Sequence, residues 1–76
     1  MSNNNLPLVT GDNIRRLRIL KGLKKFDAGK KLGICQQAYS KIECSLEISQ
    51  SKAMKILNAF ESTAEELKFI IKFTPP

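Results

Sequence analysis

Apolar residues along this chain recur at intervals of three and four, which is the spacing of helices that bury one face. In the first such segment, residues 11–21, Ile14 and Leu17 point the same way, with basic residues between them. Thr10 can cap the first turn, and Gly22 supplies a left-handed stop. The pattern therefore predicts a first helix over residues 11–21.

The next two helices are predicted to have a very short connection between them. One runs from Lys24 or Lys25 to Leu32, and the other begins near Gln36, because the segment 33–35 contains a glycine and breaks the pattern. Their inward-facing residues are Ala28, Gly29 and Leu32 in the former, and Tyr39 and Ile42 in the latter. Two helices joined by three or four residues that include a glycine have the geometry of a helix-turn-helix.

Two more helices are predicted in the second half of the chain. Ser49 caps one of them, and its apolar positions are Ala53, Ile56, Leu57 and Phe60. Ser62 and Glu65 have the spacing of a capping box, which begins a helix that carries Leu67, Ile70 and Ile71. A short C-terminal strand is the alternative, because apolar residues also alternate at Leu67, Phe69, Ile71 and Phe73.

These elements fit a single small domain with short ends. A chain of 76 residues is too short for two hydrophobic cores. Residues 1–9 are polar and then interrupted by Pro7, so we expect a flexible arm there, followed by the domain over 10–73 and a tail over 74–76. The predicted fold class is all-α, with five helices.

The positive charge of the chain is concentrated in one segment. The net charge is +6, and residues 11–41 carry nine Lys and Arg against Asp12 and Asp27. Residues 42–76 carry four Lys against five Glu. A localised positive field indicates a polyanionic partner, either nucleic acid or an anionic membrane surface, although a merely solvated lysine-rich face would have the same composition.

Several classes of protein are not expected. Residues 1–5 lack the basic and apolar pattern of a signal peptide, and no apolar run approaches the length of a membrane span, so we expect a cytoplasmic protein with reduced Cys35 and Cys44. The chain has no His and no Cys-x-x-Cys pair, so neither a metal site nor another cofactor is expected. Without a catalytic constellation or a glycine-rich phosphate loop, we expect no enzyme.

Three segments have a joint spacing that is specific: Ile14-Arg15-Arg16-Leu17-Arg18, Lys21-Gly22-Leu23, and Leu32-Gly33-Ile34-Cys35-Gln36-Gln37-Ala38-Tyr39-Ser40-Lys41-Ile42-Glu43. Over roughly residues 11–60 the chain resembles the Cro/C1-type (XRE) helix-turn-helix family. The resemblance implies a compact five-helix DNA-binding domain of phage-repressor type, with the helix-turn-helix at its second and third helices. It also implies a transcriptional regulator, a repressor above all, that binds an operator as a dimer.

The chain departs from the family pattern at several positions. Lys25 stands where the family often has Gln, and Ala28 stands where a Leu usually fills the core. Phe26 occupies a normally polar site, and we expect it to compensate partly for the small Ala28. Cys35 replaces the usual Ser or Thr cap of the third helix, so that helix start is expected to be held less firmly. Cys44-Ser45 replaces the usual exit, so the following loop is expected to differ.

The resemblance assigns roles to individual residues. The expected base readers are Gln36, Gln37 and Lys41, although two Gln at a helix start can also be merely solvated. The expected phosphate contacts are Arg15, Lys24, Lys25 and Ser40. Arg18 and Glu43 are expected to form a partly buried ion pair, the alternative being an unpaired surface Arg.

The C-terminal third holds more apolar residues than one helix face can bury in so small a core. We therefore expect a homodimer interface at Phe69, Ile70, Ile71 and Phe73, and an inverted-repeat operator on double-stranded DNA, with the protein nucleoid-associated when bound. The alternative is that these residues close the monomer core. A second function stays open, an antitoxin-like or adaptor module that docks a protein partner through residues 67–73 and binds DNA for autoregulation. A membrane-surface peptide is disfavoured, because the basic residues lie on several short helices.

Overall fold

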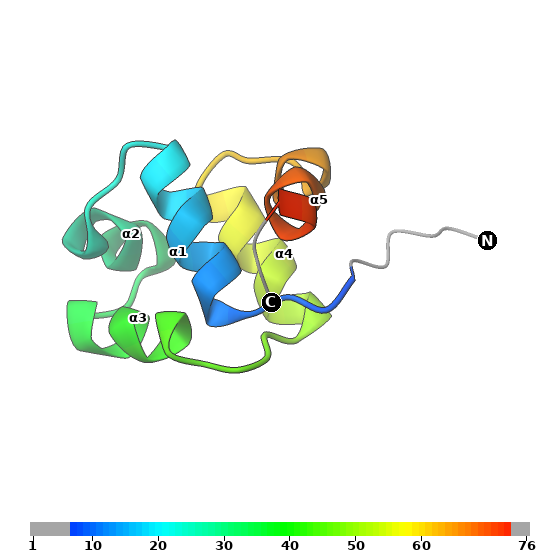
Figure 1. The fold of residues 1–76 in the computed structure, drawn as a ribbon. Helices are drawn as coiled ribbons and strands as arrows, with labels where there is room; N and C mark the ends of the chain where they lie inside the picture. The colour runs from blue at the N-terminus through cyan, green and yellow to red at the C-terminus, as the bar shows by residue number, and fades with distance from the viewer. Residues whose placement is uncertain (1–6, 74–76) are drawn as a thin grey trace.

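Residues 7–73, which the computed structural model describes, fold into helices joined by short turns (Figure 1). The helices are α1 (Gly11–Leu20), α2 (Lys25–Leu32), α3 (Gln36–Glu43), α4 (Gln50–Ala59) and α5 (Ala64–Phe73). The expected all-α fold of five helices is confirmed, and the C-terminal segment is a helix rather than a strand. Figure 1 shows α1 between α3 and α5, and α1 packs against both.

The first helix begins with a reciprocal cap. Thr10 Oγ1 accepts a hydrogen bond from the Asn13 backbone N–H at 3.2 Å, and Asn13 Oδ1 accepts one from the Thr10 N–H at 2.8 Å. Ser49 caps α4 in the expected way, because its Oγ accepts from the Lys52 N–H at 3.2 Å. These caps satisfy amide groups that would otherwise have no partner inside the helix.

The cap of α5 lies one residue later than the sequence pattern indicated. Thr63, rather than Ser62, accepts from the backbone N–H of Glu66 at 3.1 Å, and Glu66 Oε1 accepts from the Thr63 N–H at 3.3 Å. Ser62 Oγ instead donates to the same Glu66 carboxylate oxygen at 2.6 Å. The capping box is therefore formed by Thr63 and Glu66, and the predicted box of Ser62 and Glu65 is wrong. Both residue pairs have the spacing of a capping box.

The core joins all five helices around side chains of α1, α3 and α4. Its largest fully buried members are Tyr39, Ile14, Leu17, Ile56, Leu57, Leu67 and Val9. The rings of Tyr39 and Phe60 are 6.3 Å apart at an interplanar angle of 54°, which is a favourable tilted arrangement. Val9 and Ile48 are held by a single extended bridge, in which the Ile48 N–H donates to the Val9 carbonyl at 2.7 Å.

The start of α1 touches the end of α3 backbone to backbone. A Cβ added to Gly11 would overlap the carbonyl oxygens of Ile42 and Glu43, so no larger residue fits without moving α3. The Gly11 N–H also donates to the Ser45 carbonyl at 2.9 Å. The C-terminal end of α3 is therefore fixed against α1.

Helices α2 and α3 form a tight helix-turn-helix. Gly33 ends α2 with a positive φ of 74°, and the Ile34 N–H donates to the Gly29 carbonyl at 2.9 Å. A Cβ on Gly29 would lie 3.0 Å from the Ile34 carbonyl oxygen, so α2 closely approaches the turn that leads into α3.

The expected compensation between Phe26 and Ala28 does not occur. Ala28 is fully buried, whereas Phe26 points outward with 61% of its surface exposed. The core space beside Ala28 is therefore not filled by Phe26, because positions 26 and 28 lie on different faces of α2.

Candidate nucleic-acid interface

Helix α3 presents a polar face to solvent and an apolar face to the core. Gln36, Gln37 and Lys41 are exposed, Ser40 is half-buried, and Tyr39 is completely buried on the opposite side. The predicted base readers and Ser40 are thus brought together on one helix, whose orientation is set by the buried Tyr39 ring.

Two hollows flank the exposed start of α3. The α2-side hollow is lined by Phe26, Lys30, Ile34, Cys35, Gln36, Gln37 and Ser40. The α4-side hollow is lined by Cys35, Gln37, Ala38, Lys41, Ile42, Ser45 and Lys52. Because Cys35 and Gln37 line both, the N-terminal end of α3 is a ridge between two depressions.

Two basic residues of these hollows were missed by sequence reasoning. Lys30 projects into the α2-side hollow from one turn beyond Phe26, and the helical spacing of those two residues could have indicated their common face. Lys52 reaches the α4-side hollow from the first turn of α4. Lys52 and Lys41 belong to different helices, so only the tertiary fold could show that they share a hollow.

Lys24 and Lys25 lie at the start of α2, on the same part of the molecule. Both are exposed, and neither has an ion-pair partner among residues 7–73. Helix α2 also begins without a side-chain cap, since Lys24 occupies its N-cap position. Positive side chains and free amide groups coincide there, which is a favourable environment for an anion.

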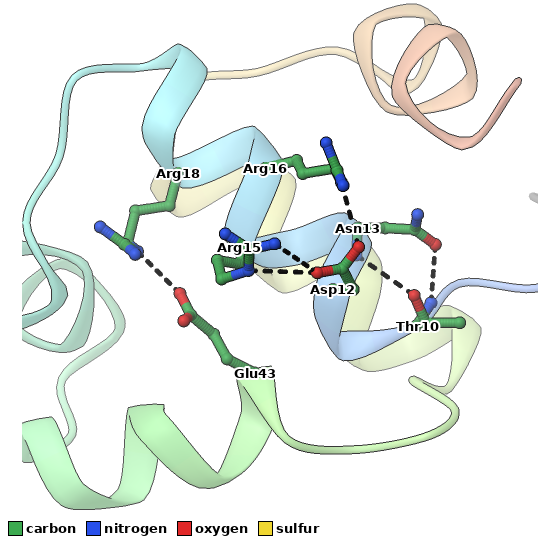
Figure 2. A network of polar contacts seen from close by, with 7 residues as sticks. All are labelled: Thr10, Asp12, Asn13, Arg15, Arg16, Arg18 and Glu43. Atoms are coloured by element: carbon green, nitrogen blue, oxygen red, sulfur yellow. Dashed lines mark hydrogen bonds and ion pairs between the residues drawn. The ribbon is translucent and has the colours of Figure 1, made fainter. Parts of the chain in front are cut away.

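Arg15 differs from these lysines because it is already paired. Its Nη2 and Nε atoms donate to Asp12 Oδ1 at 2.7 and 3.1 Å, while Arg16 Nε donates to Asp12 Oδ2 at 3.0 Å (Figure 2). Hydrogen bonds from the two guanidinium groups lower the pKa of Asp12, and the bond from Arg15 has the larger effect. The single negative charge of Asp12 therefore offsets one of the two positive charges of Arg15 and Arg16.

Arg18 and Glu43 form the expected partly buried ion pair. Arg18 Nε lies 2.7 Å from Glu43 Oε2, and the side chains are 12% and 4% exposed (Figure 2). Arg18 Nη1 also donates to the Leu23 carbonyl at 2.8 Å. The pair links the end of α3 to α1, and through Leu23 to the turn before α2.

Tyr39 and Glu43 bring two more buried polar atoms beneath α3. The Tyr39 hydroxyl and Glu43 Oε1 are both shielded from solvent and have no hydrogen-bond partner within residues 7–73. Burial of the phenol has the largest effect on the pKa of Tyr39 and raises it, and the nearby Glu43 carboxylate raises it further. In the folded protein the phenol is therefore neutral at neutral pH.

Cys35 occupies the cap position of α3. Its Sγ accepts from the Ala38 N–H at 3.4 Å, so a thiol takes the place that an oxygen acceptor usually fills. Both Cys35 and Cys44 are exposed free thiols, one at each end of α3.

The sequence model of a helix-turn-helix family, HTH_3, matches residues 14–67, which run from α1 into α5. The chain belongs to the Cro/C1-type helix-turn-helix family. It is accordingly a DNA-binding helix-turn-helix regulator, in which α2, the turn at Gly33 and α3 are the motif. No curated protein and no solved structure matched it.

None of the helices within residues 7–73 is long and apolar enough to cross a membrane. In the same part of the chain, no three or more Cys, Asp or Glu side chains gather as metal ligands would.

The apolar residues at the C-terminus of this helix-turn-helix protein divide into two groups. Ile70 is buried and Ile71 is packed against the core, so the expectation that all four residues exceed what the monomer buries is wrong for Ile70. Phe69 and Phe73 are 62% and 64% exposed, and their rings are 4.7 Å apart. With Ile19, Leu20 and Ile70 they line a mainly apolar groove of about 340 Å³ between α1 and α5, and Arg15 and Arg16 line the same groove.

Proposed function

We propose that this protein is a sequence-specific repressor that inserts α3 into the major groove of its operator. The observation that carries the proposal is the ridge formed by the start of α3 between two hollows, each lined by lysine. The major groove is wide enough for one helix and is bordered by two phosphate backbones. A helix seated there would have one backbone on the side of each hollow. Repression requires only that the bound protein occupies the operator.

The side chains of the ridge match the chemistry of base edges. Gln36 and Gln37 can each bond adenine at N6 and N7, and Lys41 can donate to guanine O6 and N7. They extend from a helix whose far end is fixed by Gly11 and by the Arg18–Glu43 pair, so their positions are set in advance.

Phosphate contacts would come from the residues around the ridge. We assign them to Lys24, Lys25 and Ser40, and add Lys30 and Lys52. Arg15 is a weaker candidate than these lysines, since binding a phosphate would require it to share or leave Asp12.

A second copy of the chain is the proposed occupant of the groove between α1 and α5. The exposed face of α5 carries Glu65 near its start, Phe69 in the middle and Lys72 near its end. Two such helices packed antiparallel would place Lys72 of one copy near Glu65 of the other, with the Phe69 rings between them. This self-complementary pattern suits a two-fold dimer on an inverted repeat with half-sites about one helical turn apart.

Selection of bound sequences from a random duplex pool tests the proposal. We expect one inverted-repeat motif to be enriched, with affinity that falls steeply as salt rises, because neutralised phosphates release counterions. Gel shifts on the selected duplex and on a scrambled duplex of the same composition provide the control. Equal affinity for both duplexes would show that the protein does not read sequence.

A further inference from the structure

The α2-side hollow has an apolar wall that contact with phosphates does not explain. Phe26 is 61% exposed and Ile34 is 36% exposed, and both line the hollow. Gln36, Gln37 and Ser40 line the same hollow, together with Lys30 and Cys35, and its volume is about 710 Å³. A single exposed aromatic residue is ordinary on a protein surface, but here two apolar side chains share one depression with the proposed base readers.

The distance between this apolar wall and the start of α3 is set by the backbone. Phe26 is the second residue of α2, and α2 is held against α3 by the close approach at Gly29 and by the hydrogen bond from Ile34 to Gly29. Phe26 therefore has a defined position relative to Gln36 and Gln37.

The major groove offers one kind of apolar group, the 5-methyl group of thymine. The other groups that distinguish the bases there are hydrogen-bond donors and acceptors, which an apolar wall would leave without a partner. We propose that Phe26, together with Ile34, receives the methyl group of a thymine next to the bases contacted by Gln36 and Gln37. Phe26 is thus a specificity-determining residue, an inference that rests on the proposed insertion of α3 into the groove.

The test combines removal of the methyl group with removal of the ring. On the operator selected with the full-length protein, each thymine is replaced in turn by deoxyuridine, which lacks only the 5-methyl group. We expect about fourfold weaker binding at one thymine in each half-site, the factor that burial of one such group provides. With Phe26→Ala the same replacement should have a much smaller effect, because only Ile34 remains, whereas Phe26→Leu should keep more of it.

Met54→Ala is the matched control, because Met54 is an exposed apolar residue of α4 that lines neither hollow. Its response to deoxyuridine should equal that of the unchanged protein. Thermal unfolding of each variant confirms that the fold is retained.

Two results would overturn the inference. If no thymine responds differently in Phe26→Ala, or if this variant weakens every sequence alike, the ring contacts sugar or solvent and reads no base. Those results leave the selected motif in place, and so leave the proposed function standing. Failure of selection to enrich any motif would instead overturn both.

Discussion

The Arg18 guanidinium meets the Glu43 carboxylate at 2.7 Å between α1 and α3, where Glu43 is 4% exposed. Removing one partner leaves the other charge buried without compensation, which costs about 3 kcal/mol or more. We expect Arg18→Ala and Glu43→Gln each to lower the free energy of unfolding by about this amount, and the double variant to lose clearly less than the sum. Urea unfolding of the four proteins measures the coupling.

Arg16→Ala serves as the control for this cycle. Its partner Asp12 is 44% exposed, and exposed pairs contribute only about 0–1 kcal/mol. A coupling energy near zero between Arg18 and Glu43 would mean that the pair does not hold α3 in place.

Gln37 and Lys25 should have separable roles in binding. Gln37→Ala should cost about 1–3 kcal/mol on the preferred site and relax one base position, because its amide reads a base edge. Lys25→Ala should weaken all sequences alike and reduce the dependence of affinity on salt by about one ion. Binding profiles across a duplex library distinguish them, and a uniform loss for both variants would place α3 in a different register.

The exposed rings of α5 should control self-association. Phe69→Ser with Phe73→Ser should convert the dimer to a monomer and weaken binding to the inverted repeat by at least about tenfold, because dimerisation makes binding of the second half-site intramolecular. Sedimentation velocity gives the oligomeric state of both proteins. Since both rings are more than 60% exposed, the free energy of unfolding should change by less than about 0.5 kcal/mol.

Truncation is a poor substitute for these substitutions. A chain ending at Glu66 would lose Leu67 and Ile70, which are part of the core. Met54→Ser provides the matched exposed control, and its dimer should persist. If the unchanged protein is itself monomeric on its operator, the dimer proposal is wrong.

Acid should weaken the contact between α1 and α5. The pKa of Glu66 is lowered to about 2 from an ordinary 4.5. The hydrogen bond from the Ser62 hydroxyl has the largest effect, followed by those from Lys21 and the Thr63 N–H. A lowered carboxylate pKa stabilises the fold above 4.5, and this contribution is lost as the pH falls towards 2. We expect Glu66→Gln to be less stable at pH 7 and to lose less stability between pH 4.5 and 2, as measured by thermal unfolding. An unchanged acid profile would contradict the assigned contacts.

The sequence was sufficient for most of the fold because the helix signals are local. Thr10, Ser49 and Gly33 act within one turn of their own position, so α1 and α4 begin, and α2 ends, where these residues predicted. The cap of α5 was misplaced because Ser62–Glu65 and Thr63–Glu66 have the same spacing, and only the backbone decides which oxygen faces the free amides.

The arrangement of the interface depended on contacts that no local pattern encodes. Lys52 reaches the same hollow as Lys41 because α4 packs beside the helix-turn-helix. The outward direction of Phe26 follows from how α2 is rotated against the core, which also buries Ala28. The pairing of Arg18 with Glu43 could be predicted only from the family resemblance, because the two residues are far apart in the sequence.

The ion pairs of α1 affect the orientation in which the protein approaches DNA. They place carboxylates beside the three arginines of α1, whereas the lysines without an ion-pair partner within residues 7–73 include Lys24, Lys25, Lys30, Lys31 and Lys41 at the helix-turn-helix. Residues 61–73 carry Glu61, Glu65 and Glu66 against Lys68 and Lys72, so the uneven charge forms a dipole whose positive end is the helix-turn-helix. Near a duplex, the phosphate field exerts a torque on such a dipole and turns α3 towards the DNA before contact. Diffusional encounters are thereby biased towards the productive orientation.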